Sequence, residues 1–237
     1  MKNLEVLSGA TIAFDLDGTL VDTAPDLIGS VNALLTQEGI APLSLALARP
    51  FIGHGARRLI ERGFAAQGRM VDTTHLDALT ARFMDHYKDH STDLSRAFPG
   101  VAESLSALKA AGARLAVCTN KPTWLSNPIL EALYLAQYFD AVIGADLAPA
   151  PKPDPRHLIC AIQAAGGTPA RAIMVGDAAP DAGSARAANV PLVLVSFGYT
   201  EVPVAELEAD IMIEHFNQLF EACIQLLPAC PVAASGL

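Results

Sequence analysis

The sequence predicts an α/β fold in which a parallel-sheet core is interrupted by an all-helical insert. Three observations lead to this class. Residues 11–14 form an uncharged run of β-branched, apolar and aromatic side chains, which is typical of a central strand buried on both faces. Residues 21–93 carry apolar side chains at helical spacing. From residue 98 onward, strand-like and helix-like segments alternate, which indicates a parallel sheet covered by helices on both faces.

The predicted first strand ends in two carboxylates. Because successive strand residues point to opposite faces, Asp15 and Asp17 share a face while Leu16 packs away from them. Gly18 then lets the backbone turn sharply. Two close carboxylates repel each other unless a cation or a proton joins them, so the pair indicates a metal site or an acid. The alternative is that both are strand-ending, helix-capping aspartates.

The helical insert, residues 21–93, is expected to contain no strand. Residues 21–25 favour a helix start, because a proline suits the first helical turn. Apolar side chains then recur at helical spacing, and glycines and prolines punctuate the pattern. The two segments that join the insert to the core, residues 20–22 and 93–98, are expected to be hinges on which the insert opens and closes.

The core elements are expected to alternate after residue 98. Helices are predicted over 101–111, 122–133, 155–165, 181–188 and 215–227, and strands over 114–119, 141–144, 172–175 and 191–195. The predicted domains are therefore a discontinuous core, residues 1–20 and 94–227, and the insert, residues 21–93. Residues 228–237 show neither a helical nor a strand periodicity and are expected to be a disordered tail.

Composition narrows the function and the location. A formal net charge of −9 argues against nucleic acid or an anionic membrane as a partner. Neither a signal peptide nor an apolar run long enough for a bilayer is expected. The four cysteines, Cys118, Cys160, Cys223 and Cys230, are scattered and form no CxxC pair, which indicates the reduced thiols of a cytoplasmic protein. A monomer or a homodimer is expected.

Further polar residues follow three later predicted strands, where open parallel sheets place their active sites. Thr119 and Asn120 lead into a helix and could cradle a phosphate, or could simply cap that helix. Lys152 stands between prolines that lower the entropy lost in presenting it, although it could be an ordinary surface lysine. Asp177 and Asp181 follow another strand, and Asp181 could cap the next helix.

These four clusters, in this order, resemble the motifs of the haloacid dehalogenase-like hydrolase superfamily. Its DxDGT motif matches residues 15–19, its strand-ending Thr or Ser matches Thr119, its KPxP setting matches residues 152–155, and its GDxxxD motif matches residues 176–181. The resemblance covers nearly the whole chain except the last residues. It implies a Rossmann-like core, and it implies that an insert between the first two motifs is a C1-type cap.

The resemblance also implies a Mg²⁺-dependent phosphatase that works through an aspartyl-phosphate. Asp15 would be the nucleophile, and Asp17 would protonate the leaving alcohol and later activate the hydrolytic water. The Asp15 and Asp177 carboxylates and the Asp17 backbone carbonyl would hold Mg²⁺, and Asp181 would support these ligands directly or through water.

Other matched residues would bind the phosphoryl group. Thr119, Asn120 and Lys152 would neutralise its oxygens, and Gly18 would lie in the loop that receives it. The chain departs from the family pattern at Ala178, where relatives often carry Ser or Thr. This departure puts one supporting hydrogen bond in doubt, but not the metal ligand beside it.

The insert is expected to select the substrate. Residues 50–59 resemble the loop and helix of the phosphoglycolate phosphatases, as do residues 98–101 and 196–199. Five arginines between residues 49 and 69 make this stretch cationic. His54 or Arg57 could therefore meet the carboxylate of the substrate, although a solvated basic helix face explains the same pattern.

The predicted function is hydrolysis of 2-phosphoglycolate, a small phosphorylated metabolite, to glycolate and phosphate. Three alternatives stay open. The chain could be a phosphatase for another small substrate, such as a sugar phosphate or pyrophosphate. It could be a sugar-phosphate mutase, which would have to shelter its phosphoenzyme from water. It could also be a binding protein without catalysis, although every motif side chain with a direct chemical role is present.

Overall fold

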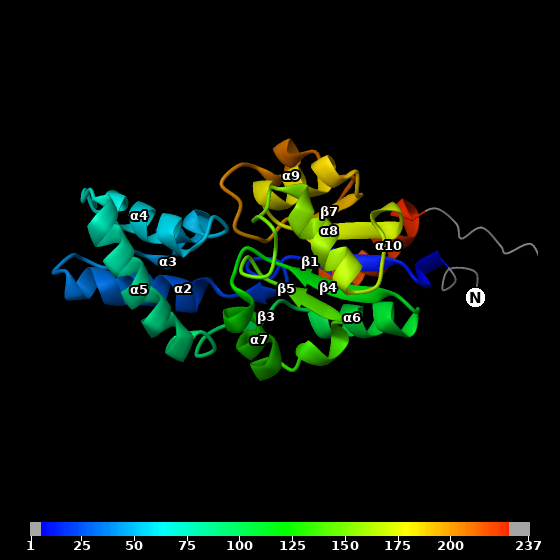
Figure 1. Cartoon of the computed structure of the whole chain (residues 1–237), viewed down its shortest axis with the longest axis horizontal. Coiled ribbons are helices and arrows are strands. Elements are labelled where there is room, and N and C mark those ends of the chain that lie inside the picture. Colours follow the sequence, from blue (N-terminus) through cyan, green and yellow to red (C-terminus); the bar gives the residue numbers. More distant parts are fainter. Residues whose placement is uncertain (1–5, 228–237) are drawn as a thin grey trace, which may run out of the picture.

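The computed structural model describes residues 6–227, and its core is a six-stranded sheet (Figure 1). All neighbouring strands pair in parallel, in the order β5-β4-β1-β6-β7-β8. The strands are β1 (Thr11–Phe14), β4 (Arg114–Cys118), β5 (Ala141–Ile143), β6 (Ala172–Gly176), β7 (Leu192–Val195) and β8 (Ile211–Ile213). Thr11 faces Arg114 on one side and Ala172 on the other, so β1 is central. The predicted tail, residues 228–237, lies outside the described residues.

Helices cover both faces of this sheet, as predicted. They are α6 (Val101–Ala110), α7 (Thr123–Ala132), α8 (Pro155–Ala164), α9 (Ala179–Ala188) and α10 (Leu219–Leu226). Ile12 and Phe14 of β1 pack in the core that includes Leu105 of α6. Ala13, between them, packs in the core that includes Leu158 of α8. This alternation, with each buried Leu or Ile contributing about 1.5–3 kcal/mol, fixes β1 between the two layers.

The helical insert has a hydrophobic core of its own. It consists of α2 (Ala24–Gln37), α3 (Leu45–Ala48), the 3₁₀ turn η1 (Arg49–Phe51), α4 (Ala56–Ala66) and α5 (Thr73–His90). Val31, Ile60 and Phe83 are among its buried side chains, and Leu125 and Tyr199 of the parallel-sheet core join the same cluster. Figure 1 shows the insert at one end of the molecule, beside the sheet. The α/β fold with a helical insert is therefore confirmed.

The segments that join the insert to the core form a short ribbon. Val21–Asp22 is the strand β2, and it pairs antiparallel with β3 (Arg96–Ala97). The Asp26 carboxylate also accepts hydrogen bonds from the Leu94 and Ser95 backbone N–H groups, at 2.8–3.1 Å. The prediction that the insert contains no strand is therefore wrong, because Val21–Asp22 forms β2. Its pairing partner lies more than 70 residues away, so the local pattern carries no signal for it.

The C-terminal part differs from the prediction in two places. The strand β8 was not predicted, because only Ile213 of its three residues is fully buried and its apolar run is very short. The helix predicted over 215–227 is split into the 3₁₀ turn η5 (Phe216–Gln218) and α10, and the His215 side chain caps the turn by accepting from Asn217 N–H at 3.1 Å. Other 3₁₀ turns are η2 (Ala136–Tyr138), η3 (Pro169–Arg171) and η4 (Val204–Leu207). Within residues 6–227, every helix is too short or too polar to cross a bilayer.

Candidate active site

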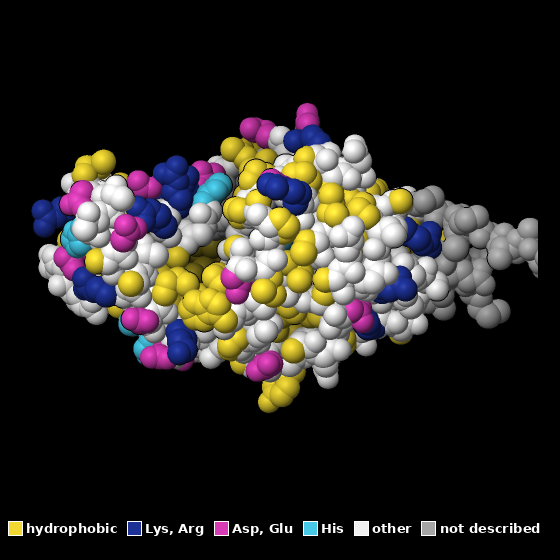
Figure 2. Space-filling model, in the orientation of Figure 1, with side chains coloured by type: hydrophobic (Ala, Val, Ile, Leu, Met, Phe, Trp, Pro, Cys, Tyr) yellow, Lys and Arg dark blue, Asp and Glu magenta, His cyan; other side chains and the backbone are white. Residues whose placement is uncertain are grey.

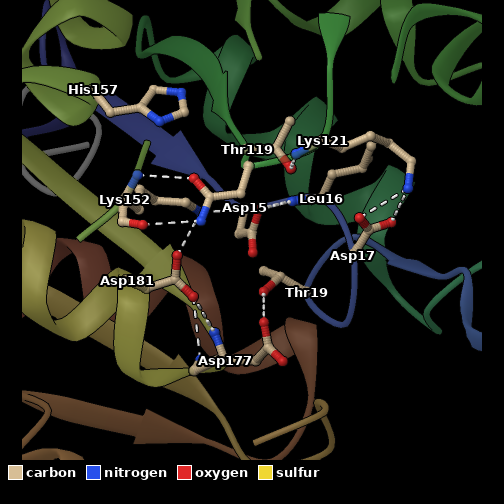
Figure 3. Close-up of polar contacts among 12 residues, drawn as sticks. Asp15, Leu16, Asp17, Thr19, Thr119, Lys121, Lys152, His157, Asp177 and Asp181 are labelled. Carbon is tan, nitrogen blue, oxygen red and sulfur yellow. Dashed lines mark hydrogen bonds and ion pairs between the residues drawn. The ribbon is translucent and has the colours of Figure 1, made fainter. Parts of the chain in front are cut away.

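The predicted site residues of the core meet at the carboxyl ends of the central strands (Figure 3). Asp15 follows β1, Thr119 follows β4 and Asp177 follows β6. These three strands are adjacent, because β1 lies between β4 and β6. The order of strands therefore brings together motifs that are more than 150 residues apart in the chain.

Three buried carboxylates form a cluster at this point. One oxygen each from Asp15, Asp177 and Asp181 lies within 4.8 Å of the others. Burial raises the pKa of Asp15 to about 6; Lys152 opposes this rise, and Asp181 adds to it. Burial, together with Asp181 and Asp15, also raises the pKa of Asp177 well above its usual range. Such a carboxylate cluster needs positive charge, so it is a candidate site for a divalent metal ion.

Lys152 supplies part of that positive charge. Its Nζ lies 3.0 Å from Asp15 Oδ1 and 2.6 Å from Asp181 Oδ1, and only 1% of the side chain is exposed. Burial alone would lower the pKa of the ammonium group, but the two carboxylates outweigh it and raise the pKa. Asn120 holds the lysine in place: its Oδ1 accepts from Lys152 N–H at 2.8 Å, and its Nδ2 donates to Lys152 O at 3.0 Å. The Asn120 side chain is thus engaged with the backbone of Lys152.

Asp177 is held in a close-fitting cradle. Thr19 Oγ1 donates to Asp177 Oδ1 at 2.9 Å, and the Tyr199 backbone N–H donates to Asp177 Oδ2 at 2.7 Å. Gly18 has a φ of +83°, and a Cβ there would lie 2.5 Å from Asp177 Oδ2. Gly198 approaches the same side chain so closely that a Cβ would clash. Glycine is therefore required at Gly18 both for the turn and for the contact with Asp177.

Asp181 links the third and fourth motifs. Its Oδ1 accepts from Lys152 Nζ, while its Oδ2 accepts from the Asp177 and Ala178 backbone N–H groups at 3.1 and 3.2 Å. The N-terminus of α9 is thus satisfied by a carboxylate at its third position. Ala178 has no hydroxyl that could cap this helix, and the Asp181 carboxylate caps it instead.

Asp17 lies outside the carboxylate cluster and has partners of its own. Both of its side-chain oxygens lie 2.9 Å from Lys121 Nζ, and Oδ1 also accepts from Thr23 Oγ1 at 2.6 Å. Only 4% of the Lys121 side chain is exposed, and its Nζ lies 4.7 Å from the centre of the Tyr87 ring. Sequence reasoning did not single out Lys121. The one available signal was its place two residues after Thr119 at a strand end.

A small cavity lies between the core and the helical insert. Its volume is about 60 Å³, and Figure 2 shows a hollow at this junction. Asp15, Asp17, Thr119 and Lys121 line it from the core, while the insert contributes mainly apolar side chains: Leu27, Ile52, Leu59, Phe83, Met84 and Tyr87. A larger hollow of about 430 Å³ adjoins Asn120 and Lys152 and reaches His54 of the insert. Both openings lead to the predicted catalytic residues.

The two predicted cap residues are differently placed. His54 Nε2 lies 3.5 Å from Glu201 Oε1, and burial and the nearby Arg62 and Arg58 lower the pKa of His54. The Arg57 guanidinium pairs with Asp77 of α5, and 46% of the Arg57 side chain is exposed. Arg57 does not line either of the two cavities described here. The structure thus brings the core site residues together but leaves Arg57 at the surface.

Known proteins resemble this chain in sequence and in fold. The family model described as haloacid dehalogenase-like hydrolase matches residues 12–195. A phosphoglycolate phosphatase of Caulobacter vibrioides is 56% identical over 237 residues, covering 100% of both chains. One of Mesorhizobium japonicum is 46% identical over 90% of this chain and 94% of its own. The crystal structure of a predicted phosphoglycolate phosphatase from Haemophilus somnus 129PT has a TM-score of 0.84 and 31% identity, covering 91% of this chain and 98% of that one.

Proposed function

The chain belongs to the haloacid dehalogenase-like hydrolase family, and from this premise we propose that it is a metal-dependent phosphatase that hydrolyses 2-phosphoglycolate to glycolate and phosphate. The observation that carries this proposal is the carboxylate cluster around Lys152, of which Asp15 lines a cavity of about 60 Å³. Relatives that are 46% and 56% identical over most or all of the chain bear the name of this activity.

The donor set fits Mg²⁺. Three buried carboxylates within 4.8 Å of one another offer the oxygen ligands that this hard cation prefers. We propose that Asp15, Asp177 and the Asp17 backbone carbonyl hold the ion, and that Asp181 supports them directly or through water. When bound, Mg²⁺ supplies positive charge that offsets the negative charge of the phosphoryl oxygens.

The side chains of the site divide the reaction between them. Leu16 N–H donates to Asp15 Oδ1 at 2.7 Å and so orients the nucleophile. A carboxylate oxygen of Asp15 attacks phosphorus, the bond from phosphorus to the ester oxygen breaks, and Asp17 protonates the departing alkoxide. Asp17 then takes a proton from the water that cleaves the aspartyl-phosphate. Thr119 and Lys152 bind the phosphoryl oxygens, and the loop at Gly18 receives the group.

The size of the cavity favours a small substrate. The cavity between the core and the insert is small, about 60 Å³, and apolar side chains of the insert line it. The glycolyl group of phosphoglycolate has only two carbons and needs less of this space than a sugar does. This argument places sugar phosphates and a sugar-phosphate mutase second. Pyrophosphate is small enough, but it offers nothing to the apolar side chains of the insert.

Phosphate release from a panel of esters tests the proposal. The panel contains phosphoglycolate, sugar phosphates, nucleotides and pyrophosphate, each with Mg²⁺ and with EDTA. We expect metal-dependent release led by phosphoglycolate. Asp15→Asn should lower kcat by more than about 1,000-fold, and Asp77→Asn, a matched change at an exposed carboxylate, should not. If another ester released phosphate fastest, the proposal of phosphoglycolate as the substrate would be wrong. If no ester released phosphate, the chain would be better explained as a binding protein.

The remaining predictions accompany this function. We propose that residues 1–20 and 94–227 form the catalytic core and residues 21–93 the cap. We also propose that the protein acts in the cytoplasm as a monomer or homodimer. Size-exclusion chromatography with light scattering measures the oligomeric state directly.

A further inference from the structure

Two buried polar groups in the small cavity are not used by the mechanism above. Lys121 is the one cation among the described residues that line this cavity. Tyr87, also in the lining, is 1% exposed, and its hydroxyl has no hydrogen-bond partner among the described residues. A buried hydroxyl without a partner is costly, because water is lost and nothing replaces it. The ammonium group and the hydroxyl lie in one apolar wall, and both can donate a hydrogen bond to an anion.

The geometry of phosphoglycolate matches this site. Its carboxylate is attached to the carbon that carries the ester oxygen, so the two lie within a few ångströms of each other. The group that holds the carboxylate must therefore lie next to the group that protonates the ester oxygen. Lys121 Nζ lies 2.9 Å from both oxygens of Asp17, the proposed acid.

Both side-chain oxygens of Asp17 are engaged in the structure. Its carboxylate oxygens accept hydrogen bonds from Lys121 Nζ and from Thr23 Oγ1, which are both side chains of the protein itself. An arriving carboxylate competes with Asp17 for the same ammonium group. A carboxylate transferred into an apolar cavity needs a cationic partner, because desolvation of an unpaired charge is very costly.

We propose that Lys121 and the Tyr87 hydroxyl bind the carboxylate of the substrate, and that Lys121 thereby leaves Asp17 free to reach the ester oxygen. Lys121 then determines specificity, because an ester without a carboxylate does not displace Asp17. The inference rests on the proposed function and names the group that selects its substrate. It differs from the prediction for Arg57, whose guanidinium pairs with Asp77 and is 46% exposed.

Steady-state kinetics on two esters of similar size test this inference. The substrates are phosphoglycolate and ethyl phosphate, which lacks the carboxylate, and the proteins are the wild type, Lys121→Met, Tyr87→Phe and Lys109→Met. Lys109 is the matched control, because it pairs with Asp140 at 2.8 Å on the surface. The readout is the ratio of kcat/KM for the two esters, which does not depend on the fraction of folded enzyme.

Lys121→Met is expected to lower this ratio by about 10- to 100-fold, and Tyr87→Phe by about 3- to 10-fold. In Lys121→Met, kcat/KM for phosphoglycolate should fall more than kcat/KM for ethyl phosphate, because only phosphoglycolate carries the carboxylate that Lys121 binds. If Lys121 had a purely structural role, its loss would lower kcat/KM for both substrates by the same factor. The ratio would then stay unchanged, and this result would overturn the inference.

The outcome for the wild type separates the two proposals. If the wild type prefers phosphoglycolate and Lys121→Met keeps that preference, the inference on Lys121 is wrong and the proposed function stands. If the wild type shows no preference for phosphoglycolate over ethyl phosphate, the proposed substrate is wrong and the inference is overturned with it. Lys109→Met should leave the ratio unchanged.

Discussion

His157 is expected to make the fold sensitive to acid. It lies on α8, is fully buried, and its Nε2 donates to Ile143 O at 3.1 Å. Its Nδ1 has no partner among the described residues. Burial lowers the pKa of His157 to about 4; the nearby Lys152 also lowers it, and Asp181 opposes the fall. The folded protein therefore holds this imidazole neutral at a pH where the unfolded chain would protonate it.

The sign and size of the effect follow from this difference. Because the folded pKa lies below the unfolded value of 6.5, the contribution to stability is complete above pH 6.5 and is lost as the pH falls through about 4. The full interval of 2.5 pKa units corresponds to about 3 kcal/mol. At pH 5 about 2 kcal/mol of it is already lost.

Unfolding of His157→Gln in urea at pH 8 and at pH 5 measures this contribution. Glutamine keeps an amide donor for Ile143 O but does not titrate. Between the two pH values, the variant should lose about 2 kcal/mol less free energy of unfolding than the wild type. His75→Gln, a change at a histidine whose side chain is 45% exposed, is the control and should follow the wild type. Equal losses in His157→Gln and the wild type would refute the reasoning.

Three other changes test single contacts. Asp177→Asn should abolish the rise in unfolding temperature that Mg²⁺ gives the wild type relative to EDTA; an unchanged rise would remove Asp177 from the metal site. Tyr199→Phe removes a hydroxyl that donates to Asp22 at 2.5 Å and accepts from Ala24 N–H at 3.1 Å. Urea unfolding of this variant should show a free energy of unfolding about 1–3 kcal/mol lower than that of the wild type, and an unchanged free energy would contradict this. Arg57→Ala removes only an exposed ion pair, so KM for phosphoglycolate should change by less than about twofold, and a tenfold rise would make Arg57 the carboxylate ligand.

The core of the site could be predicted from the sequence because its residues occupy fixed places relative to strands. Asp15 directly follows a run that is apolar, uncharged and central, and Asp177 directly follows another. Once the strands are parallel and adjacent, their carboxyl ends must meet. The backbone therefore determines where these side chains lie. To predict that these side chains lie close together, it was enough to predict the strands. The strands are the part of the fold with the clearest pattern in the sequence.

Long cations could not be placed in this way. Arg57 and Lys121 each carry a flexible side chain, and the partner that each one finds depends on residues far away in the chain. Arg57 pairs with Asp77 of another helix, whereas Lys121 turns back to Asp17, 104 residues earlier. The β2–β3 ribbon was missed for the same reason, since Val21 pairs with Ala97. Contacts of this kind follow from the tertiary fold and leave no periodic pattern in the local sequence.

The charges of the site determine the order in which its ligands can bind. Asp15, Asp177 and Asp181 carry three negative charges when ionised, and Lys152 carries one positive charge, so the group has a net charge of −2. Asp17 and Lys121 form a neutral pair beside it. A phosphate dianion that approaches this group alone is repelled at short range, where the low dielectric of the buried site strengthens the repulsion. A divalent cation cancels the net charge of −2. We therefore expect the metal ion to bind before the substrate, because the carboxylates that repel the phosphate are the ones that the cation would neutralise.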